Sequence, residues 1–345
     1  MSSSPTAEAI RAGRSQIAAR VVDRAFEANP VLWQRFGFAG RSKCVEDVGL
    51  HLDFLAQAIE LGRSELFGEY ACWARSVLSA RGIDIADFDL TLKCIGADLR
   101  DNLPDGGGGL GVAYVGAALN QSRRSPTDRP AEPLSPVAQE YLQALLSGDK
   151  RAATTLVLRA VEQGMSIQAM YLGVLQSVLQ EVGRLWQTNR ISVAQEHYCA
   201  ATTGVVMSLL YPMISSNQVG RKTVVLACVQ GELHELGLRM VADFFEMAGW
   251  SVYSTGASLP ASEIVTTVER QRADVLAVSC AYAPNLQHVT SLVRSVRDAA
   301  RARTVKIIVG GHAFSLAEDL WRQVGADGFG RNAADAVRVA TQLLA

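Results

Sequence analysis

Residues 223–248 read TVVLACVQGELHELGLRMVADFFEMA and decide the fold of the C-terminal part of the chain. The first seven residues are apolar, Gly231 and Gly237 bound a polar turn, and an amphipathic run follows. An apolar run, a glycine-bounded turn and a helix are typical of the start of a βαβ unit. His234 lies in this turn, which places it at the carboxyl edge of a parallel sheet, where ligands bind in open α/β folds.

The same alternation continues to the end of the chain. Further strands are expected at 251–254, 275–279 and 306–309, with a weak one near 328–329. Helices are expected over 238–248, 260–271, 286–301, 317–324 and 333–344. Strands separated by helical patterns predict a doubly wound parallel sheet, so residues 217–345 are expected to form a Rossmann-like domain.

Helical patterns dominate the chain before this domain. Helices over 6–29, 43–61, 65–80 and 85–102 predict an all-helical domain at 1–122, in which the run Gly106–Gly109 is expected to interrupt helical structure. The segment 123–136 contains four prolines and is interpreted as a linker. Residues 137–216 show four helical patterns joined by short turns, which predict a four-helix bundle. The expected fold class is multidomain, α and α/β.

Composition excludes several classes of protein. The formal net charge is −1, so the chain has no basic excess to favour nucleic-acid binding. The six cysteines form no C-x-x-C pair, which favours a reduced, cytoplasmic protein over a disulfide scaffold. The sequence shows no signal peptide and no apolar run long enough to cross a membrane.

The turn after the first strand carries the pattern E-x-H-x-x-G, formed by Glu232, His234 and Gly237. An exposed imidazole can bind a transition metal, and a neighbouring carboxylate can fix its tautomer. A surface histidine without a role is the more common outcome for a single such residue. Ser279 and the pair at 310–311 follow later strands and could open a slot above the sheet, although Ser and Gly are also common in ordinary turns.

With these residues, the region 222–345 resembles the cobalamin-binding Rossmann-like domain. The motif of that family is Asp-x-His-x-x-Gly, a later serine and Gly-Gly, and Glu232 replaces the aspartate here. The resemblance implies that His234 is the lower axial cobalt ligand and displaces the dimethylbenzimidazole of the cofactor, whose tail enters the pocket. The implied cobalamin contacts are Glu232, His234, Glu235, Gly237, Ser279, Gly310 and Gly311. A flavodoxin-like module without cobalt is the alternative for this domain.

A second pattern, W-x9-E-H, joins Trp186 to Glu196 and His197 across a helical hairpin. By itself this pattern favours a buried tryptophan with two solvated polar residues. It also resembles light-sensing cobalamin proteins of the CarH type, over about residues 137–345. That resemblance implies that the three side chains enclose the 5′-deoxyadenosyl group of adenosylcobalamin. Gln187 replaces the histidine that binds cobalt after photolysis in that family, so the light state is expected to differ.

The N-terminal helical domain carries aromatic, acidic and basic residues but no motif. The simplest interpretation is a helical core with a few polar exceptions. The domain arrangement is similar to photocobilins, which pair cobalamin with biliverdin, and this resemblance implies a bilin site. The candidate residues for it are Arg35, Arg41, Asp47, His51 and Tyr70.

These patterns together predict a light sensor, not an enzyme. Photolysis of the cobalt–carbon bond of adenosylcobalamin is expected to change domain packing or a homo-oligomeric state, with biliverdin as second chromophore. The alternative is a corrinoid methyl carrier that serves a cobalamin-dependent methyltransferase.

Overall fold

The computed structural model describes residues 4–103, 107–124, 133–214, 222–317 and 319–345. The chain divides into two compact units, Met1–Arg129 and Pro130–Ala345. Part of the predicted linker (125–132) and the predicted boundary at 216–217 lie outside the described residues, so the finer domain boundaries stay predictions. The helical N-terminal region and the C-terminal parallel α/β sheet are confirmed. None of the described helices is both long enough and apolar enough to cross a membrane.

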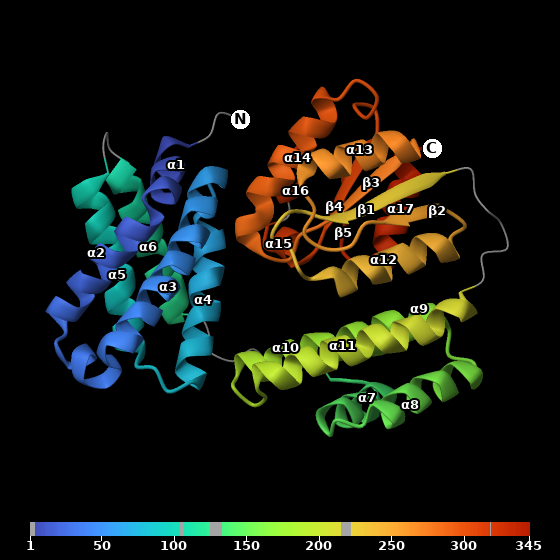
Figure 1. The fold of residues 1–345 in the computed structure, drawn as a ribbon, viewed down its shortest axis with the longest axis horizontal. Helices are drawn as coiled ribbons and strands as arrows, with labels where there is room; N and C mark the ends of the chain where they lie inside the picture. Colours follow the sequence, from blue (N-terminus) through green and yellow to red (C-terminus); the bar gives the residue numbers. More distant parts are fainter. Residues whose placement is uncertain (1–3, 104–106, 125–132, 215–221, 318) are drawn as a thin grey trace. The chain divides into compact units, whose positions relative to one another are not determined.

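The described part of the first unit is helical. Its helices are α1 (Pro5–Ala12), α2 (Arg14–Ala28), α3 (Val31–Leu61), α4 (Ser64–Ala80), α5 (Ile85–Asn102) and α6 (Gly107–Arg124) (Figure 1). Two of the predicted helices differ from the structure. The helix expected over 6–29 is interrupted at Gly13, and the helix expected from 43 begins at Val31. The latter bends at Gly37, whose φ of +59° is a conformation that glycine adopts without steric cost.

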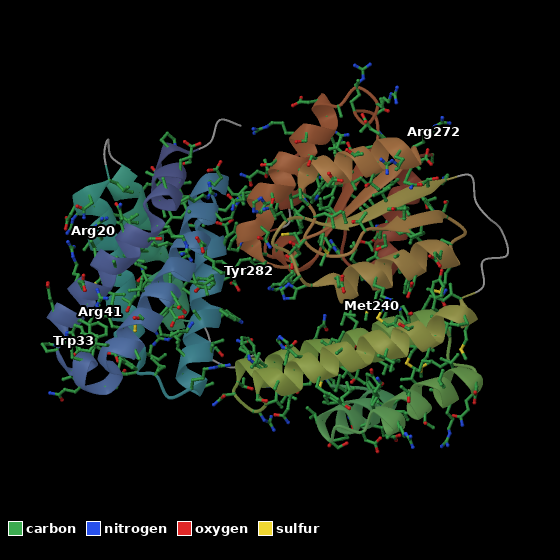
Figure 2. All side chains as sticks on the ribbon, in the orientation of Figure 1. Arg20, Trp33, Arg41, Met240, Arg272 and Tyr282 are labelled. Atoms are coloured by element: carbon green, nitrogen blue, oxygen red, sulfur yellow. The ribbon has the colours of Figure 1, made fainter. Side chains whose placement is uncertain are left out.

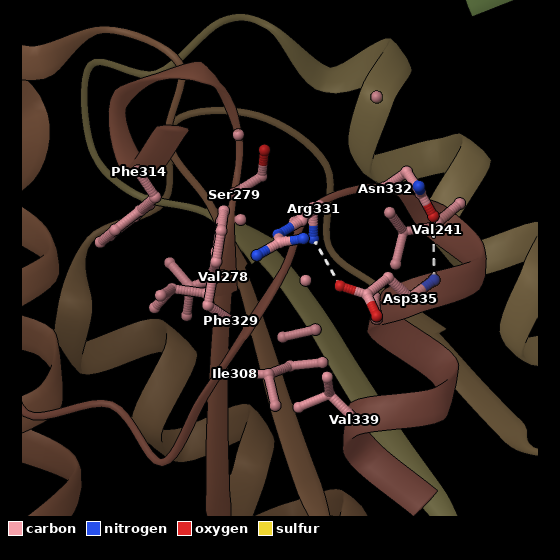
Figure 3. Close-up of a pocket in the computed structure, with 18 of the residues that line it drawn as sticks. Val241, Val278, Ser279, Ile308, Phe314, Phe329, Arg331, Asn332, Asp335 and Val339 are labelled. Carbon is pink, nitrogen blue, oxygen red and sulfur yellow. Dashed lines mark hydrogen bonds between the residues drawn. The ribbon is translucent and has the colours of Figure 1, made fainter. Parts of the chain in front are cut away.

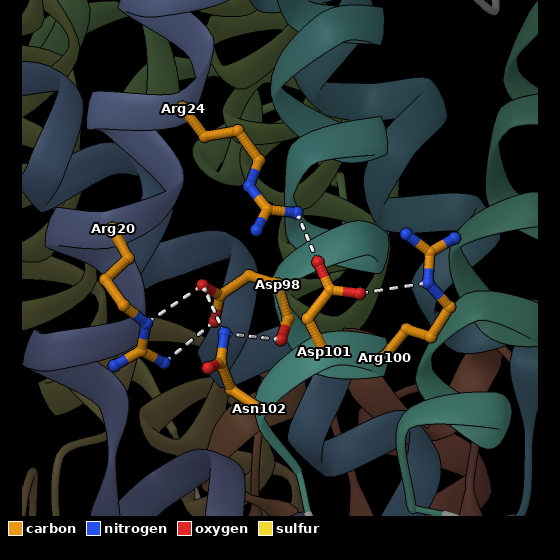
Figure 4. A network of polar contacts seen from close by, with 6 residues as sticks. All are labelled: Arg20, Arg24, Asp98, Arg100, Asp101 and Asn102. Carbon is orange, nitrogen blue, oxygen red and sulfur yellow. Dashed lines mark hydrogen bonds and ion pairs between the residues drawn. The ribbon is translucent and has the colours of Figure 1, made fainter.

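A network of charged side chains joins α2 to α5 (Figure 4). The Arg20 guanidinium donates hydrogen bonds of 2.9 and 2.8 Å to the two oxygens of Asp98. Asn102 donates a further bond of 3.0 Å to Asp98, whose side chain is only 1% exposed. Because both oxygens of this buried carboxylate are satisfied, the pairing with Arg20 favours one register of α2 against α5.

Helical structure is interrupted between Asn102, where α5 ends, and Gly107, where α6 begins, but Gly107–Gly109 form the first turn of α6 and are not part of the interruption. A Cβ atom at Gly108 would lie 2.6 Å from the Leu99 carbonyl oxygen, and one at Gly111 would lie 2.7 Å from the Leu99 side chain. The missing side chains therefore allow α6 to approach the backbone of α5 closely. This packing offsets the poor helix propensity of glycine.

The second unit begins with a helical part. Its elements are α7 (Pro136–Leu146), α8 (Lys150–Glu162), α9 (Ile167–Met170), the π-helix η1 (Tyr171–Gln176), α10 (Ser177–Gln187), α11 (Val193–Leu210) and the short η2 (Tyr211–Met213). Their buried side chains form one cluster that also contains Met240 and Phe244 of α12 (Glu235–Met247), where Figure 2 labels Met240. The helical part therefore shares a core with the α/β part. Tyr171 adds a polar link, because its hydroxyl donates a 2.7 Å hydrogen bond to Asp243 of α12.

A five-stranded parallel sheet of order β2-β1-β3-β4-β5 forms the rest of this unit. The strands are β1 (Thr223–Cys228), β2 (Ser251–Ser254), β3 (Val275–Ser279), β4 (Lys306–Gly310) and β5 (Gly328–Gly330). The register pairs Cys228 with Ser279, Ser279 with Gly310, and Gly310 with Gly330. Four strands therefore end in one row, and the loops that follow them meet at one edge.

Helices cover both faces of the sheet (Figure 1). On one face, α12 and α17 (Ala333–Leu343) share a buried cluster with side chains of β1, β3 and β4. On the other face lie α13 (Ala261–Gln271) and α14 (Leu286–Asp298), and the short η3 (Ala283–Asn285) precedes α14. The single helix expected over 317–324 is replaced by α15 (His312–Ser315) and α16 (Leu320–Gln323).

The close approach of α5 and α6 gives a matched pair of predictions. We expect Gly108→Ala to lower the free energy of unfolding by about 1–3 kcal/mol, because the added methyl group meets backbone atoms that cannot move aside. Gly116 lies on the same helix, and a Cβ atom there would have nothing within 4 Å. Gly116→Ala should raise the stability by about 0.5–1 kcal/mol. Urea unfolding of both variants measures the difference, and equal effects would contradict the packing argument.

Candidate corrinoid site

His234 lies in the loop between β1 and α12, immediately before the first residue of the helix. Its side chain is 71% exposed, whereas the side chain of Glu232 two residues earlier is fully buried. One carboxylate oxygen of Glu232 lies 2.5 Å from His234 Nδ1 and also accepts a 3.1 Å bond from the His234 backbone N–H. The imidazole is therefore held through Nδ1, and its Nε2 is the ring nitrogen left for a ligand.

The second carboxylate oxygen of Glu232 is bound by the loop that follows β3. The backbone N–H groups of Ala281 and Tyr282 donate to it at 2.8 and 2.9 Å, and Asn285 Nδ2 lies at 3.5 Å. Five donor contacts thus satisfy a carboxylate that water does not reach. The same carboxylate fixes the position of the loop after β1 against the loop after β3.

This arrangement shifts the pKa values of both partners. Burial by itself raises the pKa of the Glu232 carboxyl, but the hydrogen bonds from His234 and from the Tyr282 amide outweigh burial and hold this pKa at about 2. The hydrogen bond to Glu232 raises the pKa of the His234 imidazole despite the opposing effect of burial, and the negative charge of Glu196 contributes to the increase. The charge of Glu232 at neutral pH therefore favours a proton on Nδ1, which leaves the lone pair on Nε2 in the neutral ring.

The metal-binding side chains of this site suit a metal ion that other ligands already hold. Within the described ranges there is no group of three or more His, Cys, Asp or Glu side chains that could hold a metal ion. The described residues therefore offer no complete set of side-chain ligands for a free metal ion. A corrin ring already supplies the equatorial nitrogen ligands of its metal, so one axial imidazole such as that of His234 suffices.

A pocket of about 1570 Å³ opens at the same sheet edge (Figure 3). This volume exceeds the roughly 300–1,000 Å³ that is usual for sites of small ligands. Four of the predicted contacts line the pocket: Gly237, Ser279, Gly310 and Gly311. His234, Glu232 and Glu235 are not part of its lining: Glu232 and His234 lie in the loop before α12, and Glu235 is the first residue of that helix.

The glycines of the pocket are needed for different reasons. A Cβ atom at Gly311 would lie 2.4 Å from the Cys280 carbonyl oxygen, and the φ of Gly311 is +96°. Gly310 is less tight, since a Cβ there would lie 3.1 Å from the Gly330 carbonyl oxygen. Nothing lies within 4 Å of a Cβ at Gly237, so the absence of a side chain leaves open space at the pocket. A broad, flat ligand could occupy that space.

One wall of the pocket was missed in the sequence. Arg331 and Asn332 follow β5, and Figure 3 shows them with Asp335 opposite Ser279. Asn332 caps α17 by accepting a 2.9 Å bond from the Asp335 backbone N–H, while the Asp335 carboxylate accepts from the Arg331 backbone N–H at 3.1 Å. Asn332 before the predicted helix 333–344 was a usable capping signal. The three-residue strand before it was too short to place the residues at the sheet edge.

Two cysteines lie beneath the histidine loop. Cys228 ends β1 and Cys280 follows β3, and both side chains are fully buried. Burial raises the pKa of the Cys228 thiol to about 12 and that of Cys280 well above its ordinary value. Both thiols therefore stay protonated near neutral pH.

The residues of the W-x9-E-H pattern lie at one end of the hairpin of α10 and α11. Trp186 is partly buried and packs against the core of the helical part. His197 Nδ1 lies 2.7 Å from a carboxylate oxygen of Glu196, and the His197 side chain is exposed. None of the three lines the pocket.

The five candidates for a bilin site have partners within the helical unit. Arg35 pairs with Asp87 at 2.5 Å, Arg41 pairs with Asp23, and Asp47 lies 3.4 Å from Lys43. The buried His51 bonds through Nδ1 to the Tyr70 hydroxyl at 2.7 Å, and burial lowers the pKa of His51 to about 4. Each candidate therefore already has a partner within the helical unit.

Two known protein families match parts of the second unit. Residues 222–338 match the family described as "B12 binding domain", and residues 137–211 match a second family with the same description. Both matches support a cobalamin-binding protein. They cover the sheet with His234 and the helices with Trp186, Glu196 and His197.

Individual relatives are corrinoid proteins. A corrinoid protein of Desulfitobacterium hafniense (strain Y51) is 24% identical over 210 residues, which are 59% of this chain and 96% of the relative. A dimethylamine corrinoid protein of Methanosarcina barkeri is 24% identical over 60% of this chain and 97% of its own length. The solved structure of the monomethylamine corrinoid protein of Methanosarcina barkeri has a TM-score of 0.55 at 18% identity. It covers 60% of this chain and 98% of that chain, and it shows the fold of the second unit.

The prediction of a light sensor is contradicted by these relatives, which favour the alternative of a corrinoid methyl carrier. Biliverdin, the adenosyl form of the cofactor and a light-dependent oligomer have no support, whereas a corrinoid cofactor is supported. The prediction depended on three side chains, Trp186, Glu196 and His197. A tryptophan packed against a helical core and an acid bonded to its neighbour also have an ordinary structural explanation at the end of a hairpin.

The Glu232–His234 contact generates a pH prediction. We expect Glu232→Gln to lower the pKa of His234, because an uncharged amide oxygen stabilises the imidazolium less than a carboxylate does. The imidazolium of the variant should therefore lose its proton at a lower pH. NMR titration of the ring protons of His234 in the cofactor-free protein measures this change.

Glu235→Gln provides the matched control for that titration. It removes one carboxylate from the same loop but not the one that bonds to Nδ1. The control should leave the pKa of His234 close to that of the unchanged protein. A Glu232→Gln variant with an unchanged titration would contradict the assigned hydrogen bond.

Proposed function

We propose that this protein is a corrinoid methyl carrier in which His234 is the lower axial ligand of the cobalt. The observation that carries the proposal is the exposed imidazole of His234, held by the buried Glu232 at the edge of a large pocket. When bound, the corrinoid supplies a cobalt atom to which a methyl group can be attached and from which it can be removed. The corrinoid relatives support this role over light sensing.

Glu232 sets the orientation and the protonation of the ligand. Its carboxylate accepts from Nδ1, so Nε2 is the nitrogen that would bind the cobalt. Partners of a ligating histidine typically change metal affinity by about 10–100-fold when they are removed. Since Glu232 is itself held by the amides of Ala281 and Tyr282, the ligand is pre-organised before the cofactor arrives.

The pocket is proposed to receive the tail of the corrinoid, which His234 displaces from the cobalt. Ser279 can donate a hydrogen bond to the tail, and Gly237, Gly310 and Gly311 leave room beside it. Glu235 lies at the start of α12, next to the ligand. The pocket is lined by apolar groups of the sheet and by polar groups of the β5–α17 loop, which suits a tail with a flat base and a polar linker.

The helices of residues 137–216 are proposed to form a four-helix cap over the other face of the corrin. Trp186, Glu196 and His197, at one end of the α10–α11 hairpin, would then face the cofactor from above. Their role in a carrier is to limit access of water to the cobalt. A separate methyltransferase, which the cap must admit, would perform the chemistry of adding and removing the methyl group, so this chain is not itself an enzyme.

The first prediction from this role concerns the ligand. We expect His234→Ala to weaken binding of hydroxocobalamin on the order of 100-fold and to abolish the spectral change caused by an axial imidazole. Titration of the purified protein with hydroxocobalamin, followed by absorbance, measures both effects. His288→Ala on α14 is the matched control and should bind as the unchanged protein does. Equal affinity and spectrum for the His234 variant would contradict the proposal.

A second measurement separates a carrier from a light sensor. We expect illumination of the protein loaded with adenosylcobalamin to leave its size in solution unchanged, because no light-dependent assembly is part of a carrier. Size-exclusion chromatography before and after illumination tests this point.

In parallel, the reduced cobalamin-loaded protein should accept a methyl group from methyl iodide, seen as a change in absorbance. A change in size with light, or failure to be methylated, would argue against a carrier.

A further inference from the structure

The loop between β2 and α13 runs beside β1 beyond the end of β2. The Cys228 backbone N–H donates to the Gly256 carbonyl oxygen at 3.1 Å, and the Leu259 N–H donates to the Cys228 carbonyl at 3.1 Å. An isolated bridge pairs Val229 with Leu259. The backbone of this loop is therefore fixed to the segment that leads into the histidine loop.

Ser258 continues this contact onto the histidine loop itself. Its backbone N–H donates to the Glu232 carbonyl oxygen at 3.0 Å, and its side-chain oxygen accepts a 3.1 Å bond from the Gly231 N–H. Both bonds reach consecutive residues just before His234. One residue thus contacts the two backbone groups that orient the start of the ligand loop.

The backbone of Ser258 has an uncommon conformation. Its φ is +55°, a left-handed value that serine rarely adopts. Such conformations persist where surrounding contacts fix them, and they are frequent at ligand sites. In this conformation the N–H and the side-chain oxygen of Ser258 both reach the histidine loop. Two other described residues, Asn189 and Arg272, share a positive φ without being glycine, but they follow the ends of α10 and α13.

The histidine loop is therefore held from two sides by different means. The loop after β3 holds the side chain of Glu232, and the loop after β2 holds the backbone of Gly231 and Glu232 through Ser258. We infer that Ser258 is a positioning residue that sets the geometry of His234 as a cobalt ligand. This inference rests on the proposed function, because it assumes that His234 binds cobalt.

Three substitutions separate the conformation of Ser258 from its hydrogen bond. Ser258→Gly adopts a positive φ freely but has no side-chain oxygen, and Ser258→Ala lacks both advantages. Ser258→Asn tolerates the left-handed conformation and supplies a side-chain oxygen, so it should rescue the function. The control is Ser291→Ala, because Ser291 is exposed on α14 and donates to Gln287 within the same helix.

The test measures histidine coordination directly. Protein labelled with ¹⁵N-histidine is loaded with cobalamin in the Co(II) state, and free ¹⁴N-imidazole is added as competitor. Electron paramagnetic resonance distinguishes the doublet splitting of coordinated ¹⁵N from the triplet of ¹⁴N. We expect Ser258→Ala and Ser258→Gly to need roughly two- to ten-fold less imidazole for half displacement, the effect of losing one hydrogen bond. Ser258→Asn and Ser291→Ala should behave as the unchanged protein.

The outcomes distinguish the two levels of the proposal. The role of Ser258 alone would be overturned if Ser258→Ala and Ser258→Gly needed as much imidazole for half displacement as the unchanged protein. It would also be overturned if Ser258→Asn needed as little imidazole as Ser258→Ala. Absence of a ¹⁵N doublet in the unchanged protein would overturn the assignment of His234 as ligand and, with it, the proposed function. If the Ala variant does not fold, comparison of Gly with Asn carries the test. Faster hydrogen exchange of the Gly231 amide in the cofactor-free Gly variant would support the same contact independently.

Discussion

The hydrogen bond between the buried carboxylate of Glu232 and the exposed imidazole of His234 is the interaction on which the second unit depends. A carboxylate without access to water is costly unless its oxygens are bound, and here every donor comes from a loop at the same sheet edge. The interaction therefore requires the loops after β1 and β3 to meet. The same hydrogen bond holds the exposed side chain of His234 in one orientation.

The parallel sheet makes this meeting possible. Because Cys228, Ser279 and Gly310 share one row of the register, the segments that follow them leave the sheet at the same level. α12 begins directly after His234 and packs its Met240 and Phe244 into the helical part. His234, the pocket and the helical part of the second unit are thus connected through α12.

Much of this architecture was predictable from periodicity. The strand–turn–helix pattern around His234 placed the ligand loop and the sheet, because apolar strands and amphipathic helices differ in period. The β5–α17 wall was missed because the weak strand signal near 328–329 did not place Arg331 and Asn332 at the sheet edge, and the start of α6 was missed because glycine propensity ignores packing. Ser258 has no signal at all, since a positive φ at serine depends on contacts far along the chain. The prediction of a light sensor was wrong because it depended on three residues of one hairpin, whereas the second unit as a whole is similar to corrinoid proteins.

The two buried cysteines below the histidine loop have a consequence for the proposed role as a methyl carrier. Thiolates are strong nucleophiles and attack methyl donors, whereas protonated thiols do so poorly. Burial keeps Cys228 and Cys280 protonated, although they lie directly beneath the histidine loop. Under the proposed function, the interior of the sheet would be chemically inert toward the methyl group, which would be preserved for the partner instead of being lost to sulfur within the protein.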